Sequence, residues 1–233
     1  MKKAVILAAG RGTRMGEMTS EIPKPMLLVH GRPILEHVAE GLAAAGVEQF
    51  LIVVGYRREA IEQYFRDSRF DIEFRVQERV DGTGSAARLA RDFAGSDPFL
   101  LTFGDILCTP PDHVRCERML MDHPATRAVI GVKDVDDPWR GAAVYVEDGV
   151  VRRIVEKPPP GTSTTRWNSA GLYAMHPVVF PYLERLQPSP RGEYELTSIF
   201  DMMLADELEL RISPIEGEWR DIGYPDDLRA VNG

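Results

Sequence analysis

Cysteine and histidine are sparse in this sequence. The two cysteines, Cys108 and Cys116, are eight positions apart, no Cys-x-x-Cys pair occurs, and the five histidines are scattered. These spacings match neither a zinc site nor a disulfide framework, and the histidines form no pattern typical of a catalytic triad. We therefore expect both cysteines to have structural roles.

Positive charge is also in deficit, and no apolar run is long. The formal net charge is −8 at pH 7, which argues against a nucleic-acid-binding surface, because such surfaces depend on clustered basic side chains. The apolar run after Lys3 is too short for a signal-peptide core, and no later segment approaches a membrane span. We expect a cytoplasmic protein that has neither nucleic acid nor a membrane as its partner.

Length and composition are those of one large α/β domain. Hydrophobic residues make up 44% and charged residues 27% of the 233 positions, which is ordinary for a globular protein. Continuous apolar runs alternate with helical patterns in the first half and predict βαβ units in a parallel sheet, whereas the later runs, with a turn at Asp148-Gly149, predict antiparallel strands. The predicted strands are residues 4–7, 50–54, 72–76, 99–103, 128–132, 142–146, 150–155 and 208–215, and residues 167–173 lead into a further strand. The predicted helices begin at Pro33, cover residues 60–65 and 178–183, extend from Thr83 through Phe93, and begin near residues 198 and 225.

The most informative stretch is the polar loop that follows the first predicted strand. Gly10 and Gly12 have no Cβ, so the backbone N–H groups of this loop can approach an anion closely. Arg14 adds a fixed fork of donors and Lys24 a mobile point charge, which together suit phosphate. Met15 stands where a dinucleotide-binding loop needs a third small residue, and no phosphate P-loop pattern occurs, so both of those classes are disfavoured.

Two short motifs in this region carry a family resemblance. Residues 10–15 read Gly-Arg-Gly-Thr-Arg-Met, and after a short polar gap residues 23–26 read Pro-Lys-Pro-Met. The combination closely resembles the signature of the sugar-1-phosphate nucleotidyltransferases, also called nucleotide-sugar pyrophosphorylases. The resemblance implies a short single-domain form over residues 1–233, with a nucleotide-binding half (1–110) and a sugar-phosphate-binding half (111–233). It implies a Rossmann-like, mixed, mostly parallel sheet flanked by helices, with a small antiparallel sugar-binding part.

The resemblance also assigns catalytic and metal-binding residues. From the residues alone, a carboxylate at a strand end, such as Asp105 in its Gly-Asp pair, is either a helix cap or a metal ligand. The resemblance places Asp105 and Asp221 at Mg²⁺, the cofactor of the family. It further implies that Arg14, Lys24 and Asp105 are catalytic.

Other positions match the substrate contacts of the family. Gln77 and Gly82 correspond to residues that bind the base; taken alone they favour a solvent-facing amide and a helix start, and the shared context with the first loop reverses that preference. Glu156 and Lys157 resemble the pair that contacts the sugar and its phosphate, although such residues also form surface charge pairs. The substrate-binding residues implied by the resemblance are Ala8, Ala9, Gly10, Gly12, Thr13, Gln77, Gly82, Thr83, Gly141, Glu156, Lys157 and Asn168.

The implied reaction joins a sugar-1-phosphate to a nucleoside triphosphate and releases pyrophosphate. Gln77 and the run at residues 192–197 favour UTP or dTTP. A cytidylyl- or guanylyltransferase acting on choline phosphate, inositol phosphate, or mannose- or heptose-1-phosphate is the alternative. A catalytically silent nucleotide-sugar sensor is a third hypothesis, and it would predict the loss of Lys24, Asp105 or Asp221. Homo-oligomers are common in the family, so a second copy of the chain is also a possible partner.

Overall fold

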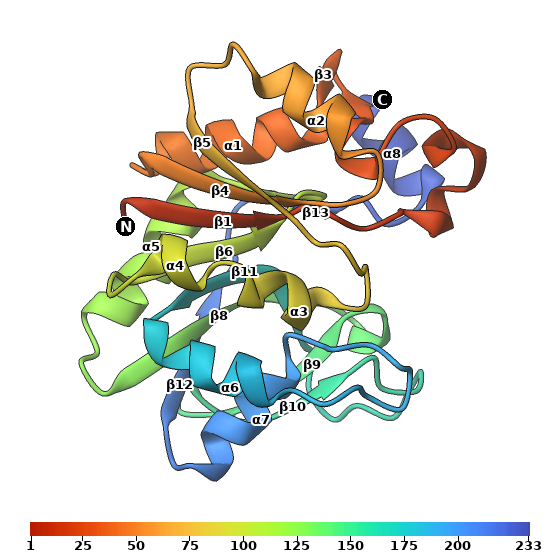
Figure 1. The fold of residues 1–233 in the computed structure, drawn as a ribbon. Coiled ribbons are helices and arrows are strands. Elements are labelled where there is room, and N and C mark those ends of the chain that lie inside the picture. Colours follow the sequence, from red (N-terminus) through yellow and green to blue (C-terminus); the bar gives the residue numbers. More distant parts are fainter.

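A nine-stranded mixed sheet forms the centre of the protein. The computed structural model describes residues 1–233 (Figure 1). In chain order the strands of this sheet are β1 (Lys3–Leu7), β4 (Gln49–Val54), β5 (Asp71–Val76), β6 (Phe99–Phe103), β8 (Thr126–Asp134), β9 (Ala142–Glu147), β10 (Val150–Glu156), β11 (Trp167–Met175) and β12 (Glu209–Pro214). Their spatial order is β5-β4-β1-β6-β11-β8-β12-β10-β9. The predicted α/β class with a mixed sheet is therefore confirmed.

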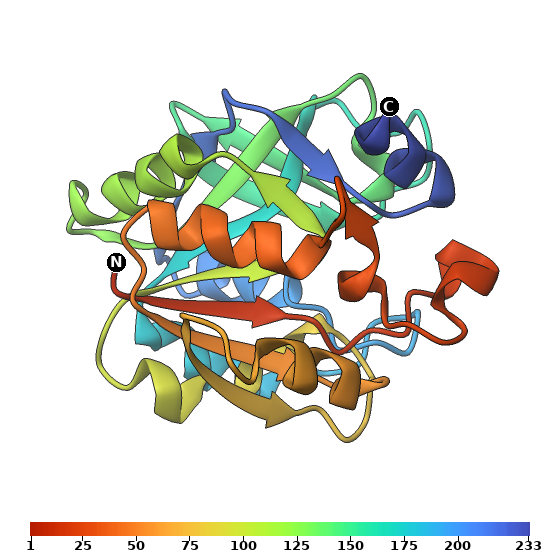
Figure 2. The ribbon, with the colours of Figure 1, turned by 90° about the horizontal axis from the view of Figure 1, so that it is seen from above.

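The half of the sheet built from β5, β4, β1 and β6 is entirely parallel. Ile6 of β1 is in register with Ile52 on one side and with Thr102 on the other. Because these strands are parallel, their carboxyl ends lie at one edge, which is where α/β sheets form ligand sites. Figures 1 and 2 show this edge on the side of the red loop after β1.

The antiparallel half begins at β11, which pairs antiparallel with both β6 and β8. It ends in the β9–β10 hairpin, as predicted from the turn. Asp148 (φ 50°) and Gly149 (φ 76°) are both left-handed, the conformation that a two-residue hairpin turn requires.

Helices cover both faces of the sheet, and each face has its own apolar core. One face carries α1 (Ile34–Ala44), α2 (Arg58–Phe65), α5 (Pro110–Met121) and α8 (Pro225–Asn232). In Figure 2, α1 (orange) lies across this face with α5 (green) and α8 (dark blue) on the same side. The opposite face carries α3 (Thr83–Arg88), α4 (Arg91–Ala94), α6 (Phe180–Arg185) and α7 (Ser198–Ala205). The chain contains no helix with the length and apolarity needed to span a bilayer.

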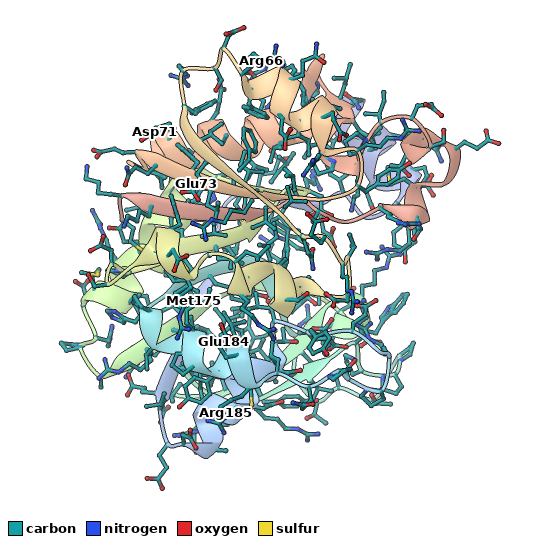
Figure 3. All side chains as sticks on the ribbon, viewed as in Figure 1. Arg66, Asp71, Glu73, Met175, Glu184 and Arg185 are labelled. Carbon is teal, nitrogen blue, oxygen red and sulfur yellow. The ribbon has the colours of Figure 1, made fainter.

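Side chains between the sheet and its helices are buried, and those on the outer faces of the helices are exposed. Met175 at the end of β11 is fully buried, whereas Glu184 and Arg185 at the end of α6 point outward (Figure 3). In α1 the residues Ile34, Leu35, Val38 and Leu42 are buried, which is the apolar face that their spacing predicts.

Several elements differ from the sequence-based expectation. The helix expected from Thr83 through Phe93 is two short helices, α3 and α4, because the backbone leaves the helical ladder at Leu89 and Ala90. The helix predicted over residues 178–183 is η4 (Pro177–Val179) followed directly by α6. The short elements η1 (Thr13–Thr19), η2 (Lys24–Met26), β2 (Leu28–Val29), β3 (Arg32–Pro33) and η3 (Pro138–Arg140), together with α5, had no sequence prediction. The same holds for β7 (Ile106–Cys108) and β13 (Trp219–Asp221), which form a separate two-stranded antiparallel ribbon.

Candidate active site

Three adjoining cavities lie at the carboxyl edge of the parallel strands. One of about 280 Å³ is lined by the loop after β1 and the start of α3. A second, of about 230 Å³, is lined by residues of β9, β10 and β11, and a third, of about 630 Å³, lies between η3 and α8. Arg14 lines all three, Asp105 lines the first two, and Asp221 lines the second and third. These three side chains therefore mark the junction of one continuous cleft.

The loop after β1 is held in place by glycine geometry and by one buried threonine. Gly12 has φ +64°, and a Cβ there would lie 2.7 Å from the Cβ of Lys24, so only glycine fits. The Thr19 hydroxyl donates to the carbonyls of Gly12 and Gly16, and Met15 anchors the loop in the core. The backbone of this loop is thereby presented to the first cavity.

Lys24 is not the mobile point charge that the sequence suggested. Its side chain is buried, and its Nζ forms an ion pair with the Asp105 carboxylate. The reason is the short helix η2, which turns the residue inward beneath the Gly12 loop. The positive charge is thus fixed at the boundary between the first two cavities.

Asp105 and Asp221, 116 positions apart, are brought together by the β7–β13 ribbon. Asp221 pairs with Ile106, the residue after Asp105, and the Ile222 N–H donates to the Asp105 carbonyl at 3.1 Å. Asp221 faces the cleft, but the surrounding protein removes much of its hydration. This loss of hydration, together with the charge of Asp105, raises the pKa of Asp221 to about 6 against the opposing effect of Lys24 and Arg14.

The pair of carboxylates fits a hard divalent cation. Carboxylate oxygens are the ligands that Mg²⁺ prefers, and the raised pKa of Asp221 indicates a negative charge that the protein's own cations do not fully compensate. No group of three or more His, Cys, Asp or Glu side chains is arranged to hold a metal. Any ion held by Asp105 and Asp221 would therefore take its remaining ligands from a phosphate and from water, which is common for Mg²⁺.

Arg14 lies beside this pair and is oriented by an aromatic ring. Its guanidinium is 5.2 Å from the ring centroid of Tyr224, the residue that precedes α8. Burial lowers the pKa of Arg14, but Tyr224, Asp221 and Asp105 outweigh that effect and raise it. A permanently charged, oriented guanidinium at a junction of cavities suits the binding of a phosphate chain.

Gln77 is buried in the first cavity with its amide in a defined orientation. Its Nε2 donates to the Gly82 carbonyl at 2.9 Å and to the Ser85 hydroxyl at 2.8 Å. A carbonyl can only accept, so the nitrogen must face Gly82, and the Oε1 atom is left for a ligand. Gly82 itself has no room for a Cβ because the backbone of Tyr194 passes directly beside it.

The second cavity contains the predicted sugar-binding residues. The Lys157 N–H donates to the Gly141 carbonyl at 2.7 Å, which ties the two segments together. Glu156 accepts a hydrogen bond from the Thr197 hydroxyl at 2.9 Å, and burial together with the nearby Glu195 raises the pKa of Glu156. Asn168 packs against Gly141 so closely that a Cβ on the glycine would overlap its amide.

The structure gathers nearly all of the predicted residues around the cleft. Those lining the first cavity are Ala8, Ala9, Gly10, Gly12, Arg14, Lys24, Gln77, Gly82, Thr83 and Asp105. Those lining the second are Arg14, Thr83, Asp105, Gly141, Glu156, Lys157, Asn168 and Asp221. Thr13 differs: it is exposed at the start of η1 and lines no major cavity, because the αL turn at Gly12 directs the chain away from the cleft.

Several lining residues had no sequence prediction. Glu193 lines the first cavity, and Tyr173, Thr197 and Trp219 line the second. The Trp219 indole donates to the Ala170 carbonyl at 2.9 Å, which attaches β13 to β11. Glu193 and Thr197 lie inside the family-like run at residues 192–197, so position in that run was the available signal.

Comparison with known proteins shows which family and which relatives the chain resembles. The model of the family described as "Nucleotidyl transferase" matches residues 3–233. The "UTP--glucose-1-phosphate uridylyltransferase AglF" of Haloferax volcanii is 33% identical over 231 residues, covering 97% of this chain and 93% of that protein. The "Bifunctional protein GlmU" of Methanococcus maripaludis is 34% identical over 230 residues, covering 98% of this chain and 53% of that protein. The chain thus spans about half the length of the GlmU relatives that it matches.

A solved structure shares the fold. A crystal structure of a UDP-glucose pyrophosphorylase complexed with UDP-glucose superimposes with a TM-score of 0.90, covering 100% of this chain and 97% of that one at 22% identity. At this identity the similarity establishes only the arrangement of strands and helices. What the cleft can bind follows from the chemistry of its own residues.

Proposed function

The chain belongs to the nucleotidyl transferase family, and from that premise we propose that it joins a sugar-1-phosphate to a nucleoside triphosphate, with release of pyrophosphate. The observation that carries the proposal is the shared wall of the first two cavities. Arg14, Thr83 and Asp105 line both, so a ligand in one cavity meets a ligand in the other at these residues. We assign the first cavity to the nucleotide and the second to the sugar phosphate.

The chemistry requires two polyanions to come together, so positioning and charge compensation are the main tasks. The glycine-loop N–H groups and Arg14 bind and orient the triphosphate. Lys24, fixed beside Asp105, compensates charge where the two phosphates meet. The attacking phosphate oxygen is already ionised at neutral pH, so no side-chain nucleophile or general base is needed.

Asp105 and Asp221 are the residues that would hold Mg²⁺. When bound, the ion supplies charge compensation at the α-phosphate and orientation for an in-line attack. The closeness of the two carboxylates and the raised pKa of Asp221 support this assignment.

The orientation of Gln77 supports a base that presents an N–H group. Its free Oε1 can accept from N3–H of uracil or thymine, whereas N3 of cytosine is itself an acceptor. UTP or dTTP is therefore favoured over CTP. Guanine also presents an N–H at the corresponding edge, so GTP belongs in the test. The uridylyltransferase name of the Haloferax relative also supports UTP.

The second cavity supports a hexose-1-phosphate as the acceptor. Glu156, Asn168 and the Gly141 backbone offer acceptors and donors for hydroxyl groups, and Lys157 offers a charge for the phosphate. The same relative is named for glucose-1-phosphate.

The test is pyrophosphate release across nucleoside triphosphates crossed with sugar-1-phosphates, choline phosphate and inositol phosphate, with and without Mg²⁺. We expect release with UTP or dTTP and one hexose-1-phosphate, only with Mg²⁺ present. Lys24→Met should abolish it, whereas Lys2→Met, at an exposed lysine paired with Glu48, should not. Absence of release with every pair, in a chain that still binds nucleotide, would overturn the proposal in favour of a sensor.

A further inference from the structure

The β7–β13 ribbon that holds Asp105 and Asp221 together is too small to fix its own register. It contains three residue pairs, Asp221 with Ile106, Arg220 with Leu107, and Trp219 with Cys108, and it lies outside the main sheet. Isolated two-stranded ribbons are marginally stable. A slip of one residue would move the Asp221 carboxylate by about 3.3 Å and turn it to the other face.

At the end of the ribbon opposite Asp221, the Trp219 indole bonds to Ala170 of β11, and a buried carboxylate, that of Asp112 in the first turn of α5, holds the two chain segments that enter and leave the ribbon. Its side chain is 0% exposed. It accepts hydrogen bonds from the Glu216 N–H at 3.0 Å and the Gly217 N–H at 3.2 Å, on the turn that leads into β13. It also accepts from the Thr109 hydroxyl at 2.6 Å, on the residue that follows β7. One side chain thus joins the exit of one ribbon strand to the entry of the other.

The carbonyl side of the same turn is held by a cation. Lys133 of β8 donates from Nζ to the carbonyls of Ile215 at 3.1 Å and Gly217 at 3.3 Å. The turn at residues 215–217 therefore has a carboxylate on its N–H groups and an ammonium on its C=O groups. This arrangement satisfies backbone groups that would otherwise be costly to bury.

Asp112 remains ionised in this environment. Burial alone would raise the pKa of its carboxyl group, but hydrogen bonds from Thr109, Arg115 and the two backbone amides outweigh burial and lower it. Gly217 has no space for a side chain, because a Cβ there would meet the Asp112 carboxylate at 2.6 Å and the Thr109 methyl group at 2.7 Å. The turn at Gly217 is therefore packed tightly against both Asp112 and Thr109.

We propose that Asp112 is a positioning residue for the transfer reaction: by fixing the turn that leads into β13, it places the Asp221 carboxylate opposite Asp105. This inference rests on the proposed function. Asp112 lines none of the three cavities and contacts no substrate, so it acts through Asp221.

The test is Asp112→Asn, which keeps the shape but turns one acceptor into a donor that faces other donors. Because misplacing a reacting group by about 1 Å can cost on the order of 100-fold in rate, we expect kcat per folded molecule to fall about 10- to 100-fold. The KM for the nucleoside triphosphate should stay within about threefold, because Asp112 does not touch the nucleotide cavity. Gly217→Ala disturbs the same contact from the other side and should give the same split between kcat and KM.

Hydrogen–deuterium exchange supplies a readout that does not depend on activity. Both variants should exchange faster at residues 106–109 and 216–222 and remain protected in β1 and β4. Ile61→Val, which shortens a fully buried side chain in α2, is the control for general destabilisation and should change neither kcat nor ribbon exchange. Unchanged kcat per folded molecule, or faster exchange spread evenly over the sheet, would overturn the proposal. If the wild-type chain releases no pyrophosphate, the proposed function fails, and exchange at the ribbon alone decides whether Asp112 fixes it.

Discussion

Replacing Gln77 by leucine removes the one buried amide that faces the base in the proposed nucleotide cavity. In the proposed complex of the wild-type chain, the Oε1 atom accepts from N3–H of uracil, whereas cytosine would place an acceptor against it. Leaving two acceptors face to face costs about 1–3 kcal/mol, which corresponds to a preference for UTP over CTP of about 5- to 150-fold in kcat/KM. Gln77→Leu should remove most of this preference, mainly by lowering kcat/KM for UTP.

The assay is pyrophosphate release with each triphosphate at a fixed sugar-1-phosphate concentration. Ser85→Ala is the matched control, because it removes one acceptor from the Gln77 nitrogen but leaves the hydrogen bond to the Gly82 carbonyl. This variant should keep most of the preference for UTP. Equal ratios of UTP to CTP turnover in the wild type and in Gln77→Leu would refute the role assigned to the amide.

Three further predictions concern stability and the acceptor. Burial lowers the pKa of His113 to about 4, so between pH 6.5 and pH 4 the unfolded chain protonates this side chain and the folded chain does not. The free energy of unfolding should therefore fall by about 3 kcal/mol as the pH is lowered from above 6.5 to 4. Urea unfolding between pH 7 and pH 4 should show this loss in the wild type and a smaller loss in His113→Leu; parallel curves would contradict it. Gly12→Ala should lower the free energy of unfolding by at least about 1–2 kcal/mol, the cost of a left-handed alanine, and should lower activity because the new Cβ presses on Lys24; unchanged unfolding would argue against the loop geometry. Gly141→Ala should raise the KM for the sugar-1-phosphate about tenfold or more by displacing Asn168, while leaving the KM for the triphosphate unchanged. A raised KM for the triphosphate alone would show that the nucleotide and the sugar phosphate were assigned to the wrong cavities.

Much of the fold could be predicted because its signals are local. The continuous apolar runs of β1, β4 and β6 are buried on both faces, and such runs are typical of central parallel strands. The glycine loop was recognisable because its backbone geometry and its charges lie within a few residues of each other. Asp105 could be placed at a strand end for the same reason.

The parts that could not be predicted depend on contacts between distant residues. The strands β7 and β13 have three residues each, too few to show a period, and they pair across more than a hundred positions. The burial of Lys24 depends on η2, a three-residue turn too short to show a period, and on the ion pair with Asp105, which is distant in the chain. The break between α3 and α4 likewise has no glycine or proline at residues 89–90 to mark it.

The central claim is that nucleotidyl transfer takes place in the cleft where Asp105 and Asp221 meet. The most direct measurement is the formation of nucleoside-diphosphate sugar from UTP and a hexose-1-phosphate in the presence of Mg²⁺, comparing Asp221→Asn with Asp226→Asn. Asp226 is a matched control, since it is an exposed carboxylate five positions away that pairs with Arg229. We predict a loss of about 100-fold or more for Asp221→Asn and wild-type turnover for Asp226→Asn. Turnover that survives in Asp221→Asn would contradict the account.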